Sequence, residues 1–187
     1  MKENQTGKIE VITDRMVAAI IGSGDIVQAI FSTVAELFTK TMKDTGVAGK
    51  AVTEAITGVA TAAVRGTAQV GADLGAAGKG LVLGVVRGAK ETGVEGISAI
   101  RDTAEAAIQA TASVGGDLET ATRGLIEGAI QGAKTVGISA EDAVSAATEG
   151  ALKAAGKLGS TAVQTVHMGI DKATRKTEPK ETALSHA

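Results

Sequence analysis

Histidine is the side chain in this sequence best suited to proton transfer or metal binding near neutral pH, and it occurs twice, as His167 and His186. A zinc site needs three or four ligands, chosen from histidine, cysteine and carboxylate side chains, at a recognisable spacing. The chain has no cysteine, and neither histidine belongs to such a set. We therefore predict no metal site and no cofactor.

Two glycine-containing stretches could be read as phosphate-binding loops. They are GSGD at residues 22–25 and GKG at residues 78–80, and neither has the full spacing of a P-loop or a strand before it. Asp73 and Asp117 each follow glycine in similar surroundings, which favours helix capping over catalysis. No Ser/His/Asp set is present either, so we predict that the protein is not an enzyme.

Charge and hydropathy argue against a nucleic acid partner and against a membrane-spanning segment. The net charge is −2, and there is no basic stripe with interleaved aromatic residues, so we expect no nucleic acid partner. The most apolar stretch, residues 17–38, is interrupted by Asp25, Gln28 and Glu36, whereas a membrane span needs about 20 mostly apolar residues. The polar start of the chain lacks the apolar segment of a signal peptide, which makes the cytoplasm the default expectation.

The middle of the chain contains an internal repeat of 44 residues. Residues 61–100 align with residues 105–144 without a gap, and the identical pairs include Gly71/Gly115, Asp73/Asp117 and Leu81/Leu125. A fixed period of this length is typical of helical arrays in which neighbouring units bury one another. Forty-four is four times eleven, and eleven residues fill three helical turns, so we predict an all-α protein.

Helix-stop signals divide this helical sequence. Lys followed by Gly recurs near residues 45, 93 and 137, and Gly followed by Asp or Ser recurs near residues 72, 116 and 159. Ser139 and the acidic residues after it resemble a helix start. These breaks predict antiparallel helices of about 18–25 residues, each about 30 Å long. We place a polar arm at residues 1–12, the helical repeat domain at 13–170 and a polar mobile tail at 171–187.

The alternative is a continuous helix that tolerates its glycines, at a cost of about 0.5–1 kcal/mol for each interior glycine relative to alanine. We favour the folded-back array because the stop signals recur at equivalent places in the repeat.

Glycine triplets spaced four residues apart indicate where helices pack. On a helical wheel of residues 117–135, the small and apolar residues share one arc and the charged residues share the opposite side. A row of small residues lets a second helix approach more closely than the usual 8–10 Å between axes. The predicted packing interface consists of Gly80, Gly84, Gly88, Gly124, Gly128, Gly132, Ala121, Leu74, Leu81, Leu118 and Leu125.

The stretch GVAGKAVTEAITGVATAAVRG, residues 46–66, resembles the eleven-residue amphipathic repeats of synuclein-like and perilipin-like lipid-surface proteins. The absence of Cys and Trp is also similar to phasins, which coat polyester storage granules. This resemblance implies a coat protein on lipid or polymer inclusions. The glycine rows instead favour a structural protein whose helices associate with copies of the same chain into a layer, tube or filament. Both interpretations stay open at this point.

Overall fold

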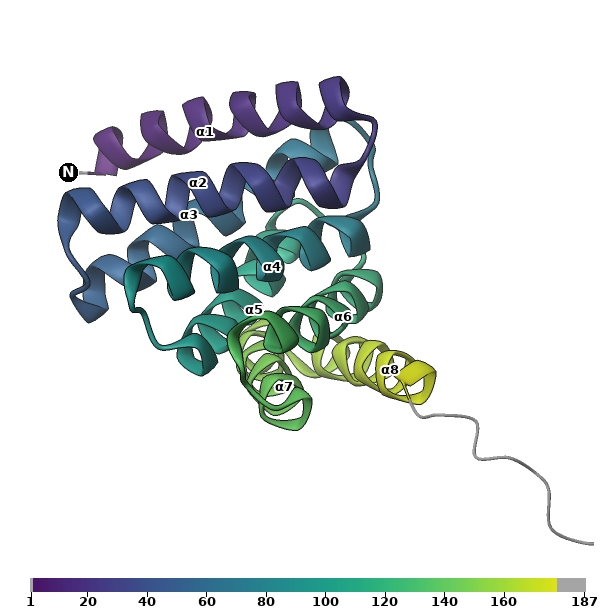
Figure 1. Ribbon diagram of the computed structural model, residues 1–187. Helices are drawn as coiled ribbons and strands as arrows, with labels where there is room; N and C mark the ends of the chain where they lie inside the picture. The colour runs from purple at the N-terminus through teal and green to yellow at the C-terminus, as the bar shows by residue number, and fades with distance from the viewer. Residues whose placement is uncertain (1, 178–187) are drawn as a thin grey trace, which may run out of the picture.

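The computed structural model describes residues 2–177, and these fold into eight helices with no strand among them. The helices contain 18 to 22 residues. They fold back on one another, as Figure 1 shows. In chain order they are α1 (Lys2–Ser23), α2 (Ile26–Thr45), α3 (Gly49–Gln69), α4 (Leu74–Thr92), α5 (Gly96–Ser113), α6 (Leu118–Val136), α7 (Ala140–Leu158) and α8 (Ser160–Thr177). The predicted all-α array of antiparallel helices is confirmed, and a single continuous helix is excluded.

Every turn of the array contains a glycine with a positive φ angle, a conformation that other residues adopt only with strain. The last five of these glycines follow one another at intervals of 22 residues, so one helix and its turn occupy half of the 44-residue repeat. They are Gly71, Gly93, Gly115, Gly137 and Gly159. The turns therefore lie where the stop signals place them in the sequence.

The first turn, between α1 and α2, is one that the sequence analysis does not predict. Gly24 has a φ angle of 69°, and the Asp25 carboxylate accepts a hydrogen bond from the backbone N–H of Gln28 at 3.0 Å. A glycine followed by a capping acid also marks the turns at Gly71, Gly93 and Gly115. The pair Gly24 and Asp25 lies inside GSGD, which the sequence analysis considers only as a phosphate loop.

Side chains cap the starts of the helices in the repeat. Asp73 accepts a hydrogen bond from the N–H of Gly75, Asp117 accepts from Glu119 and Thr120, and Ser139 accepts from Asp142. Glu95 accepts from two backbone N–H groups at the start of α5. These bonds satisfy N–H groups that have no partner within the helix, which explains the polar residues that follow Gly71, Gly93, Gly115 and Gly137.

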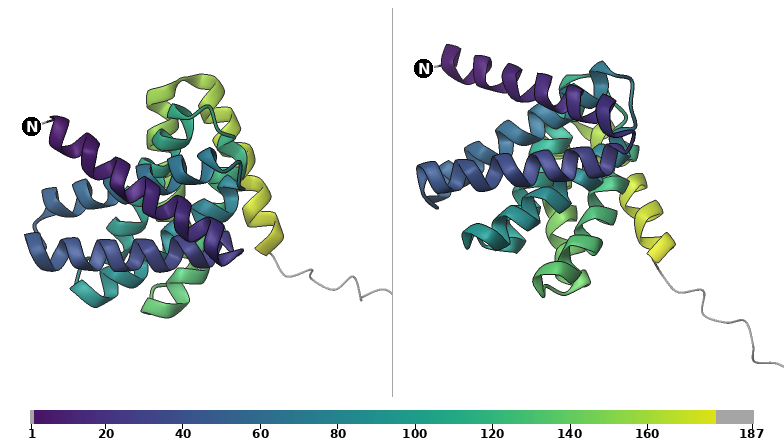
Figure 2. Two further views of the ribbon diagram at one scale, coloured as in Figure 1. Left: turned by 90° about the horizontal axis from the view of Figure 1, so that it is seen from above. Right: turned by 45° about the horizontal axis from the view of Figure 1, so that its top comes forward.

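The helices form two layers. The even-numbered helices (α2, α4, α6 and α8, called the even helices below) pack one against the next, and the odd-numbered helices (α1, α3, α5 and α7, the odd helices) do the same. Figures 1 and 2 place α1 at one end of the array and α7 and α8 at the other, with the helix axes turning along it. One 44-residue repeat is one even helix followed by one odd helix.

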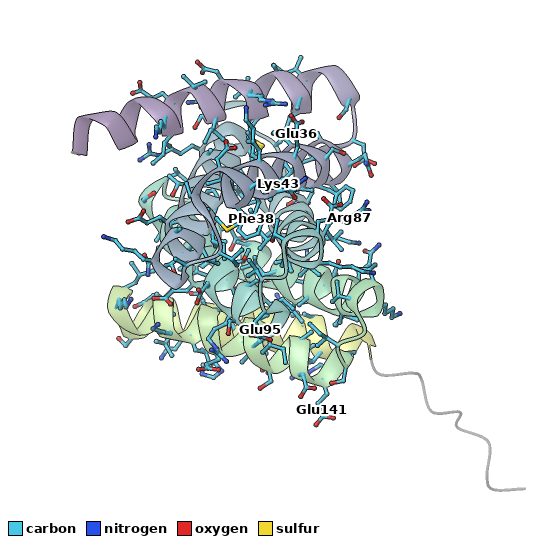
Figure 3. All side chains as sticks on the ribbon, turned by 60° about the vertical axis from the view of Figure 1, so that its left-hand side comes forward. Glu36, Phe38, Lys43, Arg87, Glu95 and Glu141 are labelled. Carbon is cyan, nitrogen blue, oxygen red and sulfur yellow. The ribbon has the colours of Figure 1, made fainter. Side chains whose placement is uncertain are left out.

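The core lies between the two layers and is built almost entirely from small and aliphatic side chains. Figure 3 shows Phe38 inside the array, whereas Glu95 and Glu141 lie at its surface. The largest fully buried side chains besides Phe38 include Met16, Ile30, Ile56, Leu81, Ile100 and Leu125. Every buried side-chain nitrogen or oxygen atom in the described part of the chain has a hydrogen-bond partner.

Both ends of the chain are more helical than the sequence analysis proposes. Residues 2–12, assigned there to a polar arm, belong to α1, and residues 171–177 of the proposed tail belong to α8. In this stretch Ile9 and Ile12 are half-buried, whereas Val11 is exposed. The rest of the proposed tail, residues 178–187, lies outside the described residues. Within the described residues, no helix is apolar and long enough to cross a membrane.

Candidate functional site: glycine-lined interfaces and the two ends of the array

The first glycine triplet, on α4, faces α2. A Cβ atom added to Gly80 would lie 2.7 Å from the carbonyl oxygen of Val27, and one on Gly84 would lie 2.7 Å from the Cβ of Val34. One on Gly88 would lie 2.7 Å from the Phe38 ring. Such distances are shorter than van der Waals contact, so each glycine is needed for the observed approach of the two helices.

The second triplet, on α6, faces α4. A Cβ atom on Gly124 would overlap the carbonyl oxygen of Gly75, and one on Gly128 would lie 2.8 Å from the carbonyl oxygen of Lys79. Gly132 differs, because its added Cβ would make an ordinary 3.5 Å contact with Val86. Two of the three glycines in this triplet are therefore required for packing, and the third is not.

The remaining predicted interface residues lie in the same region. Leu81, Leu125 and Ala121 are buried, and the Ala121 carbonyl oxygen lies against Gly78 of α4. Leu74 and Leu118, at the starts of α4 and α6, are half-buried against the core. The structure thus brings the predicted residues together in contacts within one chain, between α2, α4 and α6.

The odd helices pack through a second row of residues, which recurs at intervals of 44. We call the four residues by which an odd helix faces the preceding odd helix its rear row. Gly66 of the α3 rear row lies against Met16 of α1, and Gly150 of the α7 rear row lies against Arg101 and Ala104 of α5. The rear rows are 55/59/62/66 in α3, 99/103/106/110 in α5 and 143/147/150/154 in α7, and all of these residues except the half-buried Ala55 are buried.

The residues of α1 that lie 44 positions before the α3 rear row are called the α1 rear row, and in the described part of the chain no odd helix packs against them, although Arg15 pairs with Glu36 of α2 at 2.8 Å. This row consists of Val11, Arg15, Ala18 and Gly22, and all four are exposed. The Val11 side chain is 70% exposed, and a Cβ atom on Gly22 would meet no atom within 4 Å. This row is not evident in the sequence, because the turn glycines Gly46 and Gly71 are 25 residues apart and interrupt the regular 22-residue interval upstream of α3.

The opposite end of the array also exposes apolar side chains. Leu158, the last residue of α7, is 44% exposed, and Met168 of α8 is 49% exposed. At the first end, Ile21 of α1 is 70% exposed in addition to Val11. In the described part of the chain, four of the five large apolar side chains that are clearly exposed lie at the ends, and the fifth, Val47, lies in a turn.

An open groove of about 540 Å³ lies between α2 and α4 on the surface of the even layer. Phe31 and Ala35 line its apolar part, and six charged residues of both signs surround them. Arg87 donates a 2.6 Å hydrogen bond to Glu91, which also accepts from Thr39, and these bonds hold the pKa of the Glu91 carboxyl below its usual range. The charges therefore neutralise one another and do not select a ligand of one sign.

Ion pairs connect the odd helices across the surface. Burial raises the pKa of the Glu105 carboxyl, but hydrogen bonds from Lys153 at 2.9 Å and Lys157 at 2.6 Å outweigh it, so that its pKa lies below the usual value. Arg101 pairs with Glu149 at 2.9 Å in the same interface. These contacts tie α5 to α7 and have the geometry of structural ion pairs.

The residues considered for chemistry are dispersed over the array. His167 is exposed on α8, and His186 lies outside the described residues. Residues 22–25 form the end of α1 and its turn, and residues 78–80 lie inside α4 with both glycines against neighbouring helices. Across residues 7–175, whose side chains are described, no group of three or more His, Cys, Asp or Glu side chains could hold a metal ion.

Comparison with known proteins concerns the fold. No protein-family model and no curated protein matches the chain. Among solved structures, it is similar to the crystal structure of a de novo designed helical repeat protein, DHR7, with a TM-score of 0.57 over 94% of this chain and 96% of that one. The chain has a helical-repeat fold. Because the two sequences are only 18% identical, the similarity to DHR7 shows the fold and says nothing about function.

Proposed function

We propose that this chain is a non-enzymatic structural protein that associates with copies of itself into a higher-order assembly. The observation that carries the proposal is the exposure of large apolar side chains at both ends of the array, namely Val11, Ile21, Leu158 and Met168. Helical-repeat proteins that remain single need terminal repeats with a polar outer face, because each repeat otherwise leaves part of its packing surface open. Exposed apolar surface of this kind is typical of interaction sites.

The glycine triplets do not supply the surface for this association. Gly84 and Gly124, for example, already contact other helices of the same chain, and a second copy could reach them only if the array opened. The assembly therefore uses the ends of the array, and the triplets serve to hold each copy together.

The alternative is a coat protein on lipid or polymer inclusions. It requires the amphipathic helices to separate and to place their buried faces on an apolar phase. The buried residues are mostly alanine and valine, with small contact areas, so that opening is less costly than in a core of large side chains.

Sedimentation velocity and negative-stain electron microscopy of the purified protein without lipid test the proposal. We expect regular particles that contain many chains and grow with protein concentration. A protein that sediments as a single chain at every concentration contradicts self-association. Flotation with phosphatidylcholine vesicles or oil droplets, together with a gain in helicity, would then support the coat alternative.

A further inference from the structure

We infer that the copies join head to tail, with α7 and α8 of one copy against α1 of the next, so that the helical array continues across the junction. This inference rests on the proposed self-association and specifies its surface. The two contributing faces are different from each other, which makes the contact heterologous and open-ended.

Within the repeat, each even helix pairs with the odd helix that follows it. Three complete even–odd pairs are present, namely α2 with α3, α4 with α5 and α6 with α7. Within residues 2–177, which the structure describes, α1 is an odd helix that no even helix precedes, and α8 is an even helix that no odd helix follows. Placed side by side, α8 of one copy and α1 of the next would complete one more pair.

The rear row of α1, residues 11, 15, 18 and 22, is exposed. In α3 and α7, Gly66 and Gly150 of the rear row lie against the preceding odd helix, and the rear row of α5 is buried where α5 packs on α3. Ala62, Ala106 and Gly150, which lie 44, 88 and 132 positions after Ala18, are all buried. A preceding odd helix from another copy is therefore the occupant that fits the row, because it would repeat an interface that the chain already makes.

α7 has an uncovered face, which is equivalent to the face by which α5 contacts α7. Arg101 and Ala104 of α5 lie against α7, and the residues 44 positions later are Ser145 and Thr148. Ser145 is exposed and Thr148 is half-buried, whereas Met16, Ala60 and Ala104, at the position equivalent to Thr148, are buried. The face by which an odd helix receives the next one is thus open on α7.

Two substitutions block one face each. Ala18→Arg places a long charged side chain on the rear row of α1, and Thr148→Arg does so on the free face of α7. Arginine is a better helix former than threonine and nearly as good as alanine, so both variants should fold. Ala68→Arg, at an exposed site of α3 away from both ends, is the matched control. Circular dichroism and thermal unfolding verify that all three fold.

We expect each end variant to sediment as a single chain, while Ala68→Arg assembles like the unmodified protein. An equimolar mixture of Ala18→Arg and Thr148→Arg should form a one-to-one dimer and stop there, because each mixed pair has only one intact junction. Assembly that is lost in Ala18→Arg and normal in Thr148→Arg would indicate a symmetric contact and overturn the head-to-tail arrangement. Normal assembly of both variants would overturn it too, with self-association itself intact. An unmodified protein that remains a single chain would instead contradict the proposed function.

Discussion

Gly124 of α6 lies directly against Gly75 of α4, and a Cβ atom on Gly124 would overlap the Gly75 carbonyl oxygen. This contact between two backbones explains why a helical sequence contains so many glycines. Each glycine lowers the intrinsic stability of its helix by about 1 kcal/mol relative to alanine. The closer approach restores part of that free energy through additional dispersion contacts between the helices.

Replacing Gly124 by alanine should destabilise the protein, because the added methyl group forces α4 and α6 apart. We expect a loss of about 1–3 kcal/mol in the free energy of unfolding, as for overpacked cores, measured by urea titration with circular dichroism. Gly132→Ala is the matched control on the same helix, where the methyl group makes an ordinary contact with Val86. It should be neutral or stabilising by up to about 1 kcal/mol. Equal effects of the two variants would contradict the packing role.

Gly58 of α3 and Gly156 of α7 have open space around them, since an added Cβ atom would meet no atom within 4 Å. Alanine at either site should stabilise the folded chain by about 0.5–1 kcal/mol, because it restricts the unfolded chain and favours the helix. The midpoint of thermal unfolding measures the effect. A decrease at either position would show that the glycine has a packing partner.

Acid should weaken the starts of α5 and α6. Hydrogen bonds from Ser98 to Glu95 and from Thr120 to Asp117 lower the pKa of each carboxyl from its usual value of 4.5 or 3.8. A folded-state pKa below the unfolded one contributes stability above the unfolded pKa, and this contribution is lost as the pH falls through the folded pKa. We therefore expect the free energy of unfolding to decrease below about pH 4.5.

The variant Glu95→Gln with Asp117→Asn tests this pH dependence. Neither amide titrates, so the variant should lose less stability between about pH 6 and pH 3 than the unmodified protein does. Parallel urea titrations at each pH give the two curves. Identical slopes would mean that other carboxylates cause the acid sensitivity.

Glu105 of α5 should matter more than other surface carboxylates, because it is only 15% exposed and binds both Lys153 and Lys157 of α7. Glu105→Gln is expected to cost about 1–2 kcal/mol in the free energy of unfolding, as for hydrogen bonds to charged groups. Glu54→Gln, which breaks an exposed 3.8 Å pair with Lys50, should cost less than about 0.5 kcal/mol. A similar cost for both would place the Glu105 cluster among ordinary surface pairs.

Much of the fold follows from local sequence signals. Glycine before Asp117 or Ser139 stops one helix and allows the next to be capped, so these boundaries are readable without tertiary information. The glycine–acid pair at Gly24 and Asp25 carries the same signal, and it is overlooked because the apolar residues on both sides resemble one continuous segment. Residues 2–12 read as a polar arm because few of them are apolar, and only the structure shows that Ile12 packs against the core while Val11 stays exposed.

The sequence by itself determined the helical character of the chain, the 44-residue period of its middle part and six of the seven turns. Only the tertiary structure decided which helix each row faces. A glycine row lets any helix approach closely, whether it belongs to the same chain or to another, because the row carries no information about its partner. The tertiary structure places Gly84 and Gly124 against other helices of the same chain, and within the described residues no odd helix covers the rear row of α1.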